Sequence, residues 1–139
     1  LRADPSLVEG FVEETLRYEA PVGGLFRQAK VDTVVGGQAI AAGEHVWVLY
    51  AAANRDGERF PQPDAFDARR DNARDHLAFG HGEHYCIGAA LARAEARIAL
   101  SELLARTRNL RLAPSNDVAY EDTFVLRGLK SLQVEFDTR

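Results

Sequence analysis

Disulfides, a membrane span and a general nucleic-acid surface are excluded by what this chain of 139 residues lacks. It has one cysteine, Cys86, so no disulfide can form within the chain. Its longest uncharged, mostly apolar run, residues 46–53, is far shorter than the ~20 residues that a membrane span needs. A net charge of −4 gives no broad basic field for nucleic acid. Methionine is also absent, and we therefore expect a portion of a longer chain.

The first third of the sequence combines a helical pattern with turn signals. Asp4-Pro5 is typical of a helix N-terminus, and apolar residues at helical spacing follow until the pattern ends before Pro21. Gly36-Gly37 predicts a β-hairpin, and residues 45–50 read as a strand that contains the only tryptophan. We expect a small mixed sheet in this region.

The remaining sequence contains a long polar loop and the clearest helix. Residues 54–75 are turn-rich and lack periodicity, and their length is unusual for an idle loop. A wide apolar stripe predicts a helix from Gly88 to about Thr107, buried over a broad arc, and alternation over 132–136 predicts a closing strand. The fold is therefore expected to be mainly α with small β-sheets, an α+β fold.

Cys86 ends a loop that is punctuated by Gly80, Gly82 and Gly88, immediately before the predicted long helix. A thiolate there gains from the helix dipole and from free backbone N–H groups. Glycines on either side would let a flat group approach the backbone closely. The pattern favours a thiolate that ligates a metal and accepts hydrogen bonds at its sulfur. The alternative is a buried, inert cysteine.

Two further groupings carry open alternatives. Glu14 and Arg17 lie three residues apart and share a helix face, either as a solvated surface pair or as a pair that a third charge locks inside the protein. A zinc site is the other alternative, but the spacing is poor, because structural zinc takes two ligand pairs separated by a longer stretch. The residues that would form it are His76, His81, His84 and Cys86.

The segment Phe79-Gly80-His81-Gly82-Glu83-His84-Tyr85-Cys86-Ile87-Gly88 resembles the cysteine-ligand loop of the cytochrome P450 superfamily, the haem-thiolate monooxygenases. Glu14-Thr15-Leu16-Arg17 resembles the Glu-x-x-Arg helix of the same family. Segments 54–56, 60–67, 76–80 and 91–95 match as well, in family order. The resemblance covers essentially the whole chain and corresponds to the C-terminal part of a soluble, bacterial-type member.

The resemblance implies haem b as the cofactor, with Cys86 as the proximal iron ligand whose electron donation favours O–O cleavage. Arg27 and His84 would pair with the haem propionates, since cations suit carboxylates. Phe79 would pack beside the sulfur. The other residues that match haem-contacting positions are Gly80, Ile87, Gly88 and Ala92.

A structural network is also implied by the resemblance. Glu14 and Arg17 would join Arg70, which arrives from the long loop, in a buried cluster. Such a cluster positions the loop more than it adds net stability.

The activity implied is the insertion of one oxygen atom from O₂ into a small organic substrate. Electrons would come from NAD(P)H indirectly, through a ferredoxin or a flavin reductase at the proximal face. Arg74, Arg93 and Arg97 could form a basic patch for an acidic partner of this kind, or could instead serve intramolecular salt bridges.

The family's distal Ala-Gly-x-x-Thr segment is not present, and only residues 23–26 and 123–126 fall where the family contacts substrate. Residues 1–139 are thus expected to be the C-terminal, proximal part of one cytoplasmic haem-thiolate domain, with the N-terminal part absent. Peroxygenase or C–C coupling chemistry, and a truncated fragment without haem, are the alternatives. Open apolar faces lead us to expect that the isolated piece self-associates, swaps elements or occurs only as part of a larger body.

Overall fold

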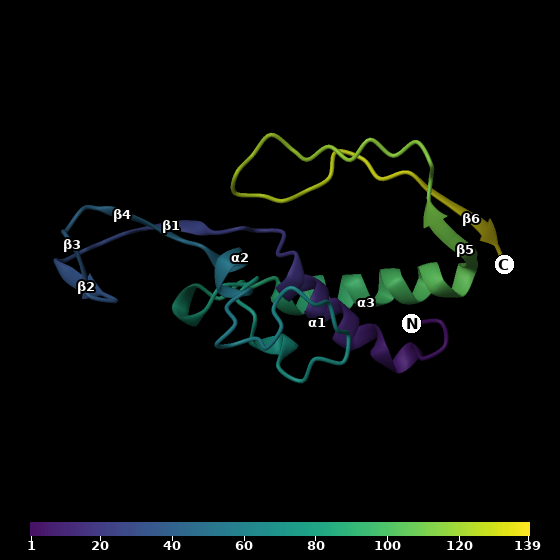
Figure 1. Cartoon of the computed structure of the whole chain (residues 1–139), viewed down its shortest axis with the longest axis horizontal. Helices are drawn as coiled ribbons and strands as arrows, with labels where there is room; N and C mark the ends of the chain where they lie inside the picture. Colours follow the sequence, from purple (N-terminus) through teal and green to yellow (C-terminus); the bar gives the residue numbers. More distant parts are fainter.

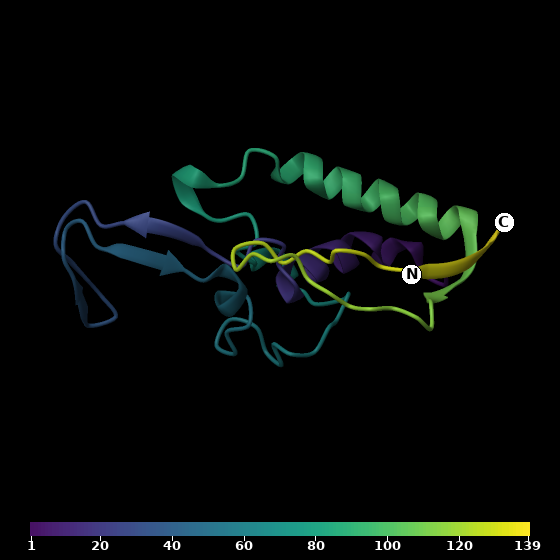
Figure 2. The ribbon, with the colours of Figure 1, turned by 90° about the horizontal axis from the view of Figure 1, so that it is seen from above.

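Two helices packed side by side form the centre of an elongated molecule, in a computed structural model that describes residues 1–139 (Figures 1 and 2). Helix α1 spans Val8–Tyr18 and follows a 3₁₀ turn at Pro5–Leu7, and α3 spans Ala89–Arg106. The Asp4 carboxylate accepts the Ser6 N–H at 3.2 Å, so the predicted N-terminal cap is confirmed.

Three separate antiparallel ribbons complete the fold. Strand β1 (Leu25–Gln28) pairs with β4 (His45–Val48), and β2 (Thr33–Val35) pairs with β3 (Gln38–Ile40). The hairpin at Gly36-Gly37 is confirmed, and both glycines have positive φ, 56° and 82°. The expected mixed sheet is wrong, because each strand pairs with a single antiparallel partner and the three two-stranded ribbons do not join into one sheet.

The last ribbon was predicted only in part. Strand β5 (Thr107–Leu112) continues directly from α3 and pairs with β6 (Val134–Thr138) at the other end of the molecule from the β1–β4 ribbon (Figure 1). The closing strand begins at Val134 rather than 132, and the sequence did not indicate β5. Strand β4 ends at Val48 rather than at Tyr50 as expected, because Tyr50 is the first residue of the short helix α2 (Tyr50–Ala53).

The core is small and lies where α1 faces the loops, and only 16 of 139 residues are buried. Helix α3 buries Ala89 alone, whereas Leu91 and Ile98 are each 64% exposed. The expected broad buried arc of α3 is therefore wrong within this chain, since α1 is the only helix that packs against it to any extent. Self-association through such exposed apolar surface stays a prediction. No helix combines the length and the apolar character that crossing a membrane requires.

Gly10 lets the long loop approach helix α1 closely. A Cβ at this position would collide with the backbone carbonyl oxygen of Ala68, which cannot move as a flexible side chain would. We expect Gly10→Ala to destabilise the protein by about 1–3 kcal/mol, because overpacking outweighs the gain in helix propensity. Gly57→Ala is the matched control, since nothing lies within 4 Å of a Cβ there. Equal unfolding midpoints of the two variants in denaturant would contradict this close approach.

Candidate functional site

Cys86 is exposed, at the end of the segment that joins the long loop to α3. We call residues 76–88 the Cys86 loop. Its Cys86 N–H donates to the Phe79 carbonyl at 2.9 Å, which closes the loop. Gly80 and Gly82 have φ values of 74° and 70°, a region that favours glycine. Within residues 1–139, Cys86 is therefore not buried in the core.

An apolar hollow of about 360 Å³ lies beside the Cys86 side chain. Seven of its ten lining residues are hydrophobic, and His84 supplies a titratable nitrogen at its wall. A thiol at an apolar hollow with an imidazole beside it suits an apolar ligand that carries a thiolate-preferring metal. The lining residues are Leu16, Pro21, Val22, Leu25, Tyr50, Ala78, Phe79, Gly80, His84 and Cys86.

The structure brings only some of the other residues expected to contact the cofactor close to this hollow. Arg27 on β1 donates to the Tyr50 hydroxyl at 3.3 Å, and Tyr50 lines the hollow. Ala92 on α3 lines a second apolar hollow of about 120 Å³, which shares Leu16 and Phe79 with the first. Ile87 is fully exposed and lies with Gly88 outside both hollows.

Glu14, Arg17 and Arg70 meet in one buried cluster. The side chains of Glu14 and Arg17 have no exposed surface, so the alternative of a solvated surface pair is wrong. One edge of the Arg17 guanidinium binds both carboxylate oxygens, with Nε–Oε2 and Nη2–Oε1 distances of 2.8 Å. Arg70 Nε lies 3.1 Å from each carboxylate oxygen, and the Asp67 N–H donates to Oε1 at 2.9 Å.

Arg17 also determines the shape of the long loop, residues 54–75. Its remaining N–H groups donate to the carbonyl oxygens of Asn54 and Pro63, each at 2.9 Å, and of Ala65 at 3.2 Å. All five donors of the guanidinium are therefore used. Asn54, fully buried, extends the connection, because its Oδ1 accepts the Leu77 N–H at 2.6 Å at the start of the Cys86 loop.

A second carboxylate, Glu13, lies at the other side of α1. Its oxygens accept hydrogen bonds from Arg93 Nε at 2.7 Å and lie 3.2 Å from His76 Nε2. His76 is thus buried in an ion-pair cluster, and the described residues contain no group of three or more His, Cys, Asp or Glu side chains that could hold a metal ion. The basic patch expected for a partner is correspondingly reduced, since Arg93 pairs with Glu13 and Arg74 pairs with Glu9.

The buried carboxylates and histidine make stability sensitive to acid. Burial by itself would raise the pKa of Glu13 and Glu14, but hydrogen bonds from Arg93 and Arg17 outweigh it, so each pKa lies below 4.5. Burial holds the pKa of His76 below 6.5 against the opposing charge of Glu13. All three folded-state pKa values are depressed, so the unfolded chain takes up protons first as the pH falls.

We therefore expect the thermal midpoint of the protein to be highest above pH 6.5 and to fall as the pH drops below 6.5 and then below 4.5. Thermal melts across this range measure the effect. In His76→Gln the decline near pH 6.5 should be weaker, while the decline below pH 4.5 remains. A midpoint that rises on acidification would contradict these depressed values.

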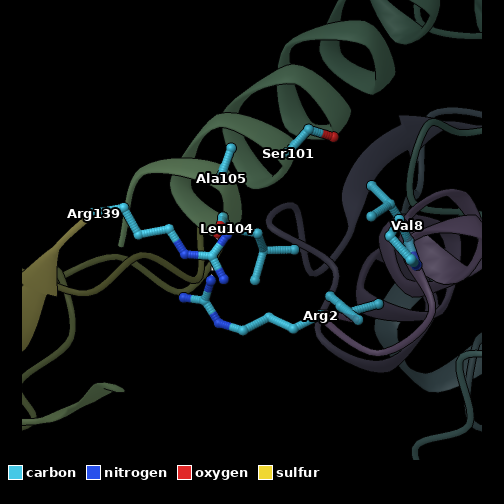
Figure 3. Close-up of a pocket in the computed structure, with 8 residues that line it drawn as sticks. Arg2, Val8, Ser101, Leu104, Ala105 and Arg139 are labelled. Atoms are coloured by element: carbon cyan, nitrogen blue, oxygen red, sulfur yellow. Dashed lines mark hydrogen bonds between the residues drawn. The ribbon is translucent and has the colours of Figure 1, made fainter. Parts of the chain in front are cut away.

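A separate hollow of about 290 Å³ lies where the ends of the chain meet the C-terminal turn of α3 (Figure 3). Arg2 donates to the Leu104 carbonyl and, at 3.0 Å, to Thr107 Oγ1. These bonds satisfy groups at the helix C-terminus, where cations are favoured by the helix dipole. Arg2 therefore caps the C-terminal end of α3 at the wall of this hollow.

Sequence reasoning missed Glu13, Asn54 and Tyr50 as members of these clusters. Glu13 is next to Glu14, which the sequence pattern does indicate. Its own partners, His76 and Arg93, lie 63 and 80 residues away in the sequence, so no local spacing pattern indicates them. Tyr50 was expected in a strand, and Asn54 was read only as part of a turn.

Comparison with known proteins shows one consistent relationship. The sequence model of the family described as Cytochrome P450 matches residues 2–136. Cytochrome P450 107B1 of Saccharopolyspora erythraea is 52% identical over 96% of this chain and 33% of its own length. Cytochrome P450 monooxygenase PikC of Streptomyces venezuelae is 50% identical over 98% of this chain and 33% of its own length.

Solved structures agree with the sequence relationship. A substrate-free cytochrome P450 of Mycobacterium marinum superposes with a TM-score of 0.95 and 41% identity, over 99% of this chain and 36% of that one. The chain therefore spans about a third of the length of the relatives it matches. The α+β architecture predicted from sequence is confirmed.

Proposed function

Because the chain belongs to the cytochrome P450 family, we propose that it forms the thiolate side of a haem site, with Cys86 as the proximal iron ligand. Members of the family use haem b, which supplies activation of molecular oxygen when it is bound. The observation that carries the proposal is the exposed thiol of Cys86 at the edge of an apolar hollow of about 360 Å³.

Each residue around the hollow has a distinct task in this proposal. Phe79 and Ala78 present apolar surface beside Cys86, against which the cofactor would pack. Arg27 offers positive charge and His84 an imidazole nitrogen for hydrogen bonds to propionates, and Arg27 is held toward the hollow by its bond to the Tyr50 hydroxyl. Ile87 and Gly88 end the Cys86 loop, and Ala92 extends the apolar surface along α3.

The Glu14 cluster serves this site from a distance. The cluster holds the long loop through hydrogen bonds from Arg17 and Arg70 to backbone carbonyl oxygens. Asn54, in that loop, in turn accepts the Leu77 N–H of the Cys86 loop. We propose that the cluster fixes the first residues of the Cys86 loop. It would thereby position the Cys86 thiolate, while its own side chains take no part in the reaction.

For the whole protein we propose a monooxygenase of which residues 1–139 are the C-terminal, proximal part. It would insert one atom of O₂ into a small organic substrate, using electrons from NAD(P)H delivered by a ferredoxin or a flavin reductase. The wide hollow that contains Tyr85, Cys86 and Ile87 is the proposed docking area of this redox partner. The exposed residues 124 and 126 lie where substrate would be contacted.

Isotopically labelled O₂ tests the proposed reaction in the full-length protein supplied with a redox partner. Monooxygenation places one labelled atom in the product and the other in water. A thiolate-type spectrum of the reduced carbon monoxide complex without label in any product would instead favour a haem-thiolate enzyme of other chemistry, such as C–C coupling. No haem absorption at all in the purified full-length protein would contradict the proposal and favour a non-catalytic protein without haem.

A further inference from the structure

The carboxylate of Glu13 is bound on both sides of the Cys86 loop: on the incoming arm by His76, the first residue of the loop, and on the outgoing arm by Arg93 of α3, the helix that follows the loop. On the incoming arm, His76 Nε2 lies 3.2 Å from Glu13 Oε2. On the outgoing arm, Arg93 binds Glu13 through Nε at 2.7 Å and Nη2 at 3.1 Å, and its Nη1 donates to the Tyr85 hydroxyl at 2.9 Å. Tyr85 immediately precedes Cys86, so one ion pair connects α1 to the residue beside the thiol.

Arg93 also contacts the residue that closes the loop. Its guanidinium carbon lies 4.7 Å from the centroid of the Phe79 ring, within the range of a cation–π contact. The carbonyl of Phe79 accepts the Cys86 N–H at 2.9 Å. The Arg93 guanidinium therefore touches Phe79, which supplies the acceptor of this hydrogen bond. It also binds Tyr85, the residue before the donor Cys86.

The ion pair between Glu13 and Arg93 is largely shielded from solvent, so breaking it would cost more than breaking an exposed pair. The Glu13 side chain is 3% exposed and that of Arg93 20%. His76 Nδ1 accepts the Ala78 N–H at 3.1 Å, so Nε2 carries the ring proton and donates to Glu13 as a neutral group. Arg93 is thus the full positive charge in contact with this carboxylate, and its loss would leave a buried anion without a counter-ion.

The geometry of α1 separates this cluster from the Glu14 cluster. Successive residues of an α-helix are about 100° apart around its axis. Glu14 consequently faces the long loop, where it binds Arg17 and Arg70, whereas Glu13 faces the Cys86 loop and α3. The two neighbouring carboxylates therefore anchor two different segments.

We propose that Arg93, held in place by Glu13, is a positioning residue for the Cys86 loop. Through Tyr85 and Phe79 it keeps the peptide that carries Cys86 in a single conformation, so that the thiolate stays directed toward the hollow. The consequence at the iron rests on the proposed function, but the restraint on the loop does not depend on it.

Hydrogen exchange of the full-length protein, as purified, tests this restraint. We expect Arg93→Gln to accelerate exchange at the Cys86 amide by about tenfold, because an amide exchanges when its local hydrogen bond opens. Tyr85→Phe removes only the hydrogen bond between Arg93 Nη1 and the Tyr85 hydroxyl, and it should give about a threefold increase in the exchange rate of this amide. Arg93→Lys keeps the positive charge but lacks the planar guanidinium that binds Glu13 and Tyr85 together. Its exchange rate at Cys86 should lie between those of Arg93→Gln and the unmodified protein. Exchange over residues 103–107, at the far end of α3, should not change.

Arg106→Gln is the control, since Arg106 forms an exposed ion pair with Glu102 on the same helix. A second readout is the reduced carbon monoxide spectrum, in which Arg93→Gln should lose thiolate-type absorption faster on storage than Arg106→Gln. Equal exchange at Cys86 in these two variants would overturn the proposal, as would equal acceleration at Cys86 and at residues 103–107. Absence of any haem spectrum would refute the proposed function while the exchange result still decides the role of Arg93.

Discussion

Cys86→Ser is expected to abolish the thiolate-type absorption of the reduced carbon monoxide complex and to reduce substrate oxidation to background. A serine hydroxyl in the same exposed position is a poor iron ligand and remains protonated at neutral pH, so the electron donation of the thiolate is lost. The measurement is the difference spectrum of the reduced full-length protein with and without carbon monoxide, together with its haem content.

Two variants make this result specific. His81→Gln changes an exposed loop residue near Cys86 and should leave the spectrum as it is. Cys86→His should convert any retained haem to a histidine-type spectrum, since imidazole is also an iron ligand. An unchanged thiolate-type band in Cys86→Ser would show that another residue binds the iron.

Glu14→Gln is expected to lower the free energy of unfolding by about 3–5 kcal/mol, the cost of removing one partner of a buried ion pair. The neutral amide would leave the fully buried guanidinium of Arg17 without a counter-ion and would weaken its contact with Arg70. It would also turn a pure acceptor toward the Asp67 N–H into a mixed donor and acceptor.

Denaturant unfolding of the full-length protein measures this loss, with Glu102→Gln as the matched control. Glu102 also pairs with an arginine, but both partners are more than half exposed, and the control should change stability by less than about 1 kcal/mol. Similar unfolding midpoints for the two variants would mean that the Glu14 cluster contributes no more than a surface pair.

Local chemistry explains which parts of this fold could be predicted from the sequence. The cap at Asp4, the hairpin at Gly36-Gly37 and the extent of α3 follow from capping, turn geometry and periodicity within a few residues. The buried state of Glu14 and Arg17 does not, because three-residue spacing fits a surface pair equally well. Burial depends on carbonyl groups 37 to 48 residues away, for which the sequence carries no local signal.

The candidate site shows the same division. The position of Cys86 between glycines and a helix could be read directly, and the positive φ values of Gly80 and Gly82 agree with that pattern. The role of Arg93 could not be decided, since free and paired arginines look alike in a sequence. Its partner Glu13 lies 80 residues earlier and meets it only when α1 packs against α3.

The way in which Arg17 holds the long loop has a consequence for sequence variation. Its guanidinium binds main-chain oxygens of positions 54, 63 and 65, and Arg70 likewise binds those of 61, 62 and 65. Every amino acid has such an oxygen, so exposed side chains in this stretch can be exchanged while the path of the backbone is kept. Substitutions should therefore accumulate freely at position 65, whereas each of the two arginines must stay an arginine for the loop to keep its shape.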